Sequence, residues 1–494
     1  MSRLHPRRSV RPIRPRLSLD ILTGKDVQAI HEAALRVLSE TGVRFPSDRA
    51  LGILADAGCE VDHGRQVARI PPDVAMAAIG RAPRRFALGA RDPADTLDLD
   101  GEHCYLSTDG CGIEVYDLET GERRRSTRDD VYRSAVVADY LDAIAFYWGP
   151  TVSAQDVPPS TRPLHELEAA FLGTSKHVQP ETILSAPVAR WCVEMALAEV
   201  GTTAELRRRP IFSVMQCAVD PLGQDGGSLE ASLVAAAHGI PTGFMPMPMS
   251  CATAPATVAG NLVVTTVDAL APLILIQLAH PGAPVFFAAA PTVMDLRTGG
   301  YTGGSPEDYL LGGAFNQICR FYGLPLSMGA MATGAKRPDW QAALDNSFST
   351  LLPVLTGTAM LTGAGMLNGS KILSYQQLVM DSEIYSVVAK VAEGIRVDAE
   401  TLAVETIQRV GPEGNYLAQP HTLRHLGDIW RPTVVDRSPY EAWEQGGGRG
   451  AYDVAADLAR DILAGHRPRE VEPAVRREWQ RILAAAGREL EATG

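Results

Sequence analysis

A polar stretch between an apolar run and a helical pattern is the first place in this chain to look for chemistry. Residues 324–328 are apolar and lie between two glycines, which predicts a short buried strand. Thr333 and Lys336 follow it, and Pro338 can open a helix that continues towards residue 352. Loops that follow strands carry the chemistry in parallel α/β folds. Lys336 is therefore a candidate catalytic residue.

Histidines and cysteines offer a second kind of chemistry, metal binding. His421 and His425 are four residues apart, which places both on one face of a helix, but no third ligand is apparent. His103, Cys104 and Cys111 do not form a known zinc-ligand spacing. We therefore expect no metal site, and a supporting or interface role for the two C-terminal histidines.

An alternation of apolar runs and helical patterns must position these residues. Runs that predict strands recur from about residue 140, and several follow a glycine that ends a helix and contain a proline at the strand start. They lie at 144–148, 182–184, 211–217, 241–245, 284–290, 324–328 and 358–367, with an eighth plausible near 372–375. Eight strand–helix units close a barrel. The alternative, an open doubly wound sheet, needs an early glycine-rich phosphate loop that this chain lacks. We therefore predict an α/β fold, a (β/α)8 TIM barrel.

The flanks of this barrel are expected to be appended elements. Residues 1–19 form an Arg-rich arm, either packed on a neighbouring subunit or disordered, and residues 20–139 an N-terminal helical and small β extension. Thr23 is suited to cap the first helix. The barrel is placed at 140–380, and residues 381–494 form a C-terminal helical region. The arm and the helical tail together favour a homo-oligomer.

Composition excludes several other classes of protein. The chain has 494 residues and a formal net charge of −12, which argues against nucleic acid as a partner. Residues 261–280 are apolar enough to suggest a membrane helix, but Asp268 and Pro272 within them favour a buried barrel helix, so we expect no membrane association. Seven scattered cysteines without a CxxC motif are typical of free thiols in the cytoplasm.

Several stretches together resemble the trimethylamine methyltransferase family, whose members pass a methyl group from a methylamine to a corrinoid protein. They are residues 116–124, 239–242, 246–255, 294–299, the stretch around Lys336, 421–425 and 436–438. The resemblance covers nearly the whole chain, and it implies a (β/α)8 barrel. It also implies a corrinoid (cobalamin) supplied by a partner protein, because the chain has no cobalamin-binding signature of its own.

The resemblance also addresses the substrate. Trimethylamine-specific members of the family carry pyrrolysine after the sixth strand, in a context similar to residues 333–339, where this chain has Lys336 and no pyrrolysine. Asp339 and Gln341 match many relatives, whereas Gly334 and Ala335 replace their Asp-Ser. Members without pyrrolysine are linked to quaternary amines such as glycine betaine. The resemblance therefore implies that this chain demethylates a quaternary amine.

A quaternary amine is already activated, because loss of methyl leaves a neutral tertiary amine, so the protein must mainly hold substrate and cobalt in line. An aromatic cage for the cation is expected at Tyr147, Trp148 and Trp340. Lys336 is a candidate partner of a betaine carboxylate, and Glu230, after the third expected strand, of the cation. His421, Asp339 and Gln341 complete the expected substrate site.

Three other functions remain open at this point. A zinc-dependent methyltransferase would need a thiolate cluster near the C-terminal strands, but the last cysteine is Cys319. The chain could instead pass methyl to another acceptor such as a folate, or bind a betaine without turning it over. No motif decides between these last two and the corrinoid enzyme.

Overall fold

The computed structural model describes residues 4–149 and 151–493, so residues 1–3 of the expected Arg-rich arm lie outside it. Eight parallel strands form the centre of the molecule, in the spatial order β10-β9-β6-β17-β16-β14-β12-β11. The two end strands approach each other through a parallel bridge between Val178 and Phe212, which closes the sheet. Their bounds are β6 Tyr105–Thr108, β9 Ile144–Gly149, β10 His177–Pro180, β11 Val214–Cys217, β12 Thr242–Met245, β14 Val285–Ala289, β16 Leu326–Gly329 and β17 Met360–Ala364. The (β/α)8 barrel is confirmed.

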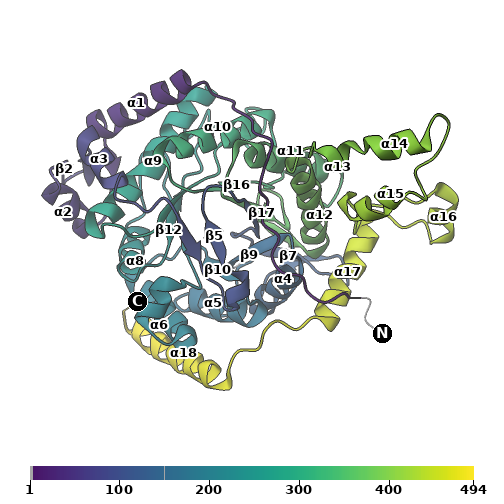
Figure 1. Cartoon of the computed structure of the whole chain (residues 1–494). Coiled ribbons are helices and arrows are strands. Elements are labelled where there is room, and N and C mark those ends of the chain that lie inside the picture. The colour runs from purple at the N-terminus through teal and green to yellow at the C-terminus, as the bar shows by residue number, and fades with distance from the viewer. Residues whose placement is uncertain (1–3, 150, 494) are drawn as a thin grey trace.

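Helices follow the strands and surround the barrel (Figure 1). They are α4 Arg128–Tyr140, α5 Arg162–Gly173, α6 Ala186–Val200 with the short α7 Thr203–Arg208, α8 Gly226–Ala237, α9 Val258–Ala279, α10 Pro306–Tyr322, α11 Trp340–Thr356 and α12 Tyr375–Ala392. Gly323 and Gly357 end α10 and α11 in the left-handed region, where glycine is favoured. Each helix returns the chain to the amino end of the next parallel strand.

Helix α9 is the one helix, among the described residues, whose length and composition would suit a membrane span. However, 78% of its most apolar window is buried inside the molecule. Asp268 in its middle is buried and accepts a hydrogen bond from the backbone N–H of Leu222 at 3.1 Å. A buried helix of the barrel explains its apolar composition, as the sequence predicted.

Two of the expected strands, and with them the start of the barrel, were placed wrongly. The first barrel strand is β6, so the barrel begins near residue 105 and not at 140. The expected eighth strand is β19 (Ile372–Ser374), which pairs outside the barrel with β7 (Glu114–Tyr116) and β18 (Met366–Leu367). The run 182–184 is a loop, because the third barrel strand ends at Pro180.

The N-terminal extension consists of helices and short strands, as expected. Thr23 caps the first helix by accepting from the N–H of Asp26. Its elements are α1 Gly24–Glu40, β1 Val43–Arg44, α2 Asp48–Asp56, β2 Glu60–Asp62, β3 Val67–Arg69, α3 Pro72–Ile79, β4 Phe86–Leu88, the 3-10 turn η1 Pro93–Asp95 and β5 Leu97–Leu99. Leu88, Leu97 and Leu99 share a buried cluster with Tyr105 and Phe286 of the barrel, so the β4–β5 hairpin fills the barrel at the amino ends of its strands.

The Arg-rich arm packs on its own chain, which corrects the expectation that it lies on a neighbouring subunit or is disordered. Ile13 forms a bridge with Cys104 and is buried. Arg7 lies 2.6 Å from Asp95, and Arg14 pairs with Glu102. These ion pairs explain why the arginines are concentrated there.

Short elements complete the mouth and the C-terminal region. At the mouth, β8 (Arg123–Arg125) pairs with β7, and β13 (Met249–Ser250) with β15 (Thr292–Val293). The C-terminal helices are α13 Ala399–Leu402, α14 Val404–Val410, α15 Pro420–His425, the 3-10 turn η2 Leu426–Asp428, α16 Tyr440–Gln445, α17 Ala451–Gly465 and α18 Pro473–Thr493. Helix α18 is anchored by Trp479, which is buried and donates from Nε1 to the carbonyl of Met195 at 2.8 Å. The helices α13–α16 extend beyond the ring of barrel helices (Figure 1).

Candidate active site

The carboxyl ends of three neighbouring strands place a tryptophan and two carboxyl groups together at the mouth of the barrel. Asp109 directly follows β6, Trp148 lies near the end of β9, and Glu181 directly follows β10. A Cβ atom built on Gly110 would lie 3.0 Å from Trp148 Nε1 and 3.0 Å from Glu181 Oε2. The indole and the carboxyl group therefore both lie against Gly110, where a side chain would displace them.

Trp148 faces the interior of the barrel. Its side chain is buried with the inward-facing residues of the other strands, and its Nε1 has no hydrogen-bond partner among residues 4–149 and 151–493. Tyr147 faces the opposite way: its hydroxyl lies 2.8 Å from Ser134 Oγ and donates to the carbonyl of Val131, both in α4. Successive side chains of a strand point to opposite faces, so only one of the two can reach the mouth. The expectation that Tyr147 belongs to a cation cage is wrong.

Glu181 is held by the turn after β6. The backbone N–H of Cys111 donates to its Oε2 at 2.6 Å, and the thiol of Cys111 donates to its Oε1 at 2.7 Å. Cys111 adopts a φ of 70°, in the left-handed region, which directs both donors towards the same carboxyl group. Burial raises the pKa of Glu181 and, together with the nearby Glu181 charge, raises the pKa of the Cys111 thiol well above its usual value. The thiol is therefore a hydrogen-bond donor and not a nucleophile.

Asp109 is the most strongly shifted acid of this group. It is 5% exposed and accepts hydrogen bonds from the N–H of Gly110, at 2.8 Å, and from the hydroxyl of Ser370. Burial, with a smaller contribution from Glu181, raises the pKa of Asp109 to about 7. A cation placed beside a buried carboxyl group with a pKa near 7 stabilises its ionised form, which burial disfavours.

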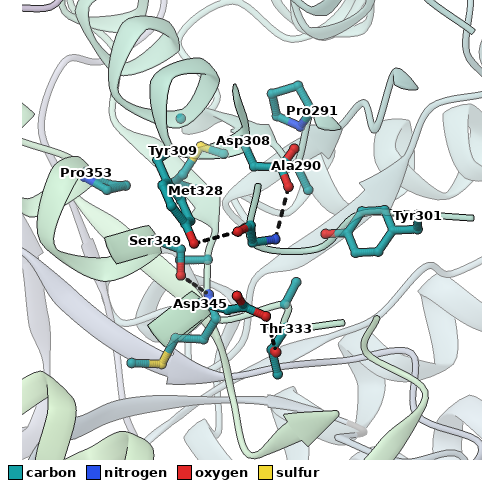
Figure 2. A pocket seen from close by; sticks show the side chains of 16 residues that line it. Ala290, Pro291, Tyr301, Asp308, Tyr309, Met328, Thr333, Asp345, Ser349 and Pro353 are labelled. Carbon is teal, nitrogen blue, oxygen red and sulfur yellow. Dashed lines mark hydrogen bonds between the residues drawn. The ribbon is translucent and has the colours of Figure 1, made fainter. Parts of the chain in front are cut away.

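Two more acids, the buried Asp345 and the half-buried Asp308, lie around a small cavity of about 30 Å³ on the other side of the mouth, room for one water molecule (Figure 2). Asp345 of α11 accepts from Thr333 Oγ1 at 2.6 Å, and Asp308 of α10 accepts from Thr292 Oγ1 at 2.8 Å. Burial raises the pKa of both. Tyr301 also lines this cavity, although the residue as a whole is 40% exposed.

A larger cavity, of about 380 Å³, opens beside Glu181 at the ends of β9 and β10. Cys111, Arg162, Glu166 and Glu181 supply its polar lining. Arg162 Nε is buried and has no hydrogen-bond partner among the described residues. Burial raises the pKa of Glu166 to about 7 although it accepts from the N–H of Ala154. The cavity thus presents this guanidinium nitrogen beside two acids, Glu166 and Glu181, whose pKa values are raised by burial.

The expected residues around Lys336 lie at the rim of the mouth. The side chain of Lys336 is exposed and its Nζ donates to the carbonyl of Gly334. Asp339 caps α11 through the N–H groups of Gln341 and Ala342, and Trp340 is 76% exposed. Only Gln341 reaches a buried acid, with its Nε2 3.4 Å from Asp345 Oδ2. The catalytic role of Lys336 stays a prediction.

Two other expected residues are not at the mouth. Glu230 lies in α8, after the fourth barrel strand and not the third, and its carboxyl group accepts from Ser47 Oγ at 2.5 Å and pairs with Arg49 of the N-terminal extension. His421 lies in α15, outside the ring of barrel helices (Figure 1). Both assignments to the substrate site are corrected, since each side chain contacts a structure appended to the barrel.

The residues that sequence reasoning missed could have been found from one signal, a charged residue directly after a barrel strand. That signal was hidden for Asp109 because Asp109-Gly110 resembles a hairpin turn, and for Glu181 because the strand before it is polar. In that strand His177 bonds to the carbonyl of Gly89 and to Ser213, and Gln179 also bonds to Ser213. Polar residues inside a barrel do not produce the apolar run by which strands are recognised.

A closed parallel barrel with a tryptophan, acids and a cavity at the carboxyl ends of its strands has the architecture of an α/β-barrel enzyme with a candidate site at this end. The chain belongs to the trimethylamine methyltransferase family: the family described as "Trimethylamine methyltransferase (MTTB)" matches residues 3–490.

Individual relatives agree with this assignment. The chain is 32% identical to the trimethylamine methyltransferase MttB of Methanosarcina thermophila over 468 residues, 94% of this chain and 97% of the relative. It is 33% identical to that of Desulfitobacterium hafniense strain DCB-2, covering 90% and 89%. It is 28% identical to the glycine betaine methyltransferase of Desulfitobacterium hafniense strain Y51, covering 95% and 98%.

Proposed function

We propose that this enzyme removes a methyl group from a quaternary amine of the glycine betaine kind and passes it to a corrinoid carried by a partner protein. The observation that carries the proposal is the placement of Trp148 and Glu181 against Gly110, which directly follows the buried Asp109. An indole face and nearby carboxylates are the groups that bind a desolvated organic cation. A relative named for glycine betaine supports the same class of substrate.

The hydrogen bonds of the two carboxyl groups favour a quaternary cation over a protonated amine. Both oxygens of Glu181 accept from Cys111, and the oxygens of Asp109 accept from Gly110 and Ser370. The two carboxyl groups therefore supply negative charge, but each of their oxygens already accepts a hydrogen bond from the protein. Trimethylammonium has an N–H that needs an acceptor, whereas a quaternary ammonium has none to satisfy.

The carboxylate of a betaine has a partner in Arg162. This guanidinium lines the cavity of about 380 Å³ that opens beside Glu181, and its Nε has no partner in the described part of the chain. A betaine with its ammonium group at Trp148 and its carboxylate at Arg162 would satisfy both ends. Arg162 thus competes with Lys336, which occupies the rim, as the carboxylate's partner.

For this reaction the protein mainly has to orient the substrate. The N–CH3 bond breaks, the nitrogen keeps the electron pair and leaves as a neutral tertiary amine, and no proton has to move. When bound at the mouth, a reduced corrinoid would supply the nucleophile that accepts the methyl group. Trp148, Asp109 and Glu181 hold the cation with one methyl group towards the opening, and the buried wall behind them keeps water from the leaving nitrogen.

A partner protein has a suitable surface on this face. Exposed apolar side chains occur on six different loops after barrel strands, which we name the mouth rim: Ile113, Leu184, Val219, Met247, Leu296 and Trp340. Apolar side chains gathered around a polar cavity are typical of a protein-binding surface. The mouth rim therefore supports delivery of the corrinoid by another protein.

The test is a methyl-transfer assay with glycine betaine, longer betaines and trimethylamine, and with reduced cobalamin or a folate as acceptor, read by mass spectrometry of the demethylated amine. Turnover of a betaine with cobalamin supports the proposal. Turnover of trimethylamine alone contradicts the quaternary-amine assignment, and turnover with folate alone contradicts the corrinoid. Betaine binding without turnover under any condition would make the chain a binding protein.

We also propose that the enzyme is a homo-oligomer in the cytoplasm. With the Arg-rich arm folded on its own chain, this expectation rests on the exposed apolar side chains of the C-terminal region, such as Ile395, Leu417 and Leu423. All seven cysteines are free, in line with a reducing compartment. Light scattering of the purified chain tests the assembly, and a monomeric mass at micromolar concentration would contradict it.

A further inference from the structure

The structure completes a cluster of metal-ligating residues that the sequence left with two members. His421 and His425 lie in α15, and Glu400 lies in α13, twenty residues earlier. One ligand atom from each of the three residues lies within 4.8 Å of the other two. The rings of the two histidines are 4.3 Å apart between centroids, so both face the same side of α15.

We propose that Glu400, His421 and His425 bind one divalent zinc-like ion that joins α13 to α15. Two imidazole nitrogens and one carboxylate oxygen are a ligand set that zinc prefers, with a fourth position open to water. Ligand atoms around a tetrahedral zinc lie about 3.3–3.6 Å apart, given bonds of about 2.0–2.2 Å. His425 Nε2 already lies 3.3 Å from one oxygen of the Glu400 carboxylate, and the ligand atoms, all within 4.8 Å of one another, need to close by about 1 Å around an ion.

Neighbouring residues orient the proposed ligands. Asp428 Oδ2 lies 2.5 Å from His425 Nδ1, which directs Nε2 of the same ring towards Glu400. Metal-bound histidines commonly use their second nitrogen in this way. Arg424 donates from Nε and Nη2 to Glu400 Oε1, at 3.1 and 2.8 Å, and none of these bonds uses Oε2. Arg424 thus holds the carboxylate over α15 and leaves one of its oxygens for a metal.

The surrounding segment needs such a link. We name residues 395–445 the C-terminal arm. The structure describes all of these residues, and the arm extends beyond the barrel helices (Figure 1). Helices α13, α15 and α16 and the turn η2 contain no buried residue, and α14 contains one, Thr406. A segment that buries almost no side chains of its own needs another source of stability, such as a bound metal ion. A bound ion would cross-link residue 400 to residues 421 and 425, and it would thereby restrict the motion of the segment between them, which contains α14.

The experiment uses the full-length chain after chelation and dialysis, titrated with Zn2+ alone by calorimetry, with metal content measured by mass spectrometry. We expect one Zn2+ per chain, at least tenfold weaker binding in Glu400→Gln and in His421→Ala, and unchanged binding in His63→Ala, an exposed histidine in the β2–β3 turn. Circular dichroism checks that the variants are folded, which is expected because the cluster is on the surface.

Limited trypsin digestion provides a second readout, because the C-terminal arm contains Arg409 and Arg437, neither of which is followed by proline. Zn2+ should slow cleavage at these sites in the wild type and not in His421→Ala. Absence of saturable Zn2+ binding, or binding that survives in both variants, would overturn the proposal. Protection from trypsin that rises with protein concentration but does not change with Zn2+ would also overturn the proposal. It would show that the C-terminal arm packs against a second copy of this chain. None of these outcomes depends on the amine substrate.

Discussion

The indole of Trp148 and the carboxyl group of Glu181 both lie against Gly110, each at 3.0 Å from where a Cβ atom on that residue would lie. Three neighbouring barrel strands contribute one residue or turn each to this contact. The proposed cation site is therefore built on rigid strand ends, and it can be altered by adding a single carbon atom.

Gly110→Ala should weaken betaine binding at least tenfold while the chain stays folded, because the added methyl group separates Trp148 from Glu181. Calorimetric titration of glycine betaine measures the effect. Gly52→Ala is the matched control, since a Cβ there meets nothing within 4 Å. Equal affinities for the wild type and Gly110→Ala would place the cation elsewhere.

Trp148→Leu removes the aromatic face and should lower betaine affinity by about 2- to 30-fold, the range that corresponds to a cation–π contact of about 0.5–2 kcal/mol. Trp148→Phe keeps a weaker face and should fall between the wild type and the leucine variant. Tyr147→Phe serves as a control on the other side of the strand, because its hydroxyl bonds to Ser134 and Val131 of α4 and to the backbone of Thr151. A loss with Tyr147→Phe as large as that with Trp148→Leu would contradict the assignment.

Betaine binding should become stronger as the pH rises through about 7. Burial raises the pKa of Asp109 to about 7, so this acid is mostly neutral below that pH and mostly ionised above it. A cation binds the ionised form better, and binding near neutrality should therefore release a proton. Calorimetry in buffers with different ionisation enthalpies detects this proton. Asp109→Asn should flatten the pH dependence, and a wild-type affinity that is constant across neutrality would refute the role of Asp109.

Arg162 and Lys336 make competing predictions about the betaine carboxylate. If Arg162 binds it, Arg162→Gln should raise KM for glycine betaine at least tenfold and have a small effect with choline, which has no carboxylate. Lys336→Ala should then change the KM for glycine betaine less than twofold, since its Nζ bonds to its own loop. The reverse pattern would restore Lys336 as the carboxylate's partner.

The mouth rim predicts a difference between free and protein-bound acceptors. Leu184→Glu and Leu296→Glu place charges on two exposed rim positions and should leave turnover with free cobalamin unchanged. The same variants should slow turnover with a corrinoid protein, because binding apolar surface against a charge is costly. Steady-state rates with the two acceptors provide the comparison, and equal effects on both would argue against docking at the rim.

The barrel could be predicted from sequence because its buried helices and most of its strands have regular signals. Glycine followed by proline marks the junctions at 239–241, 282–284 and 323–325, and in each case the next barrel strand follows within a few residues. Strand β6 was missed because it has four residues and is followed by Asp109-Gly110, a turn signal. Strand β10 was missed because His177 and Gln179 make it polar.

The candidate site was predictable only in part for the same reason. Trp148 lies near the end of a strand that was recognised, and it was found; Asp109 and Glu181 follow the two strands that were not. Tyr301 lies in a long loop, and Arg162 begins α5 after another, and the direction of such loops depends on tertiary contacts, such as the approach of Gly369 to the ring of Tyr301. Spacing along the chain could not place Glu230, because its partners Ser47 and Arg49 are about 180 residues away.

The most direct test of the central claim is a titration that changes only the charge of the ligand. Glycine betaine and 3,3-dimethylbutanoate have the same shape and the same carboxylate, but the second has carbon in place of the charged nitrogen. A site made of Trp148, Glu181 and Asp109 should bind glycine betaine at least tenfold more tightly, and Glu181→Gln should reduce that preference. Equal affinity for the two ligands would show that the mouth recognises shape and carboxylate alone, and the quaternary-amine account would be wrong.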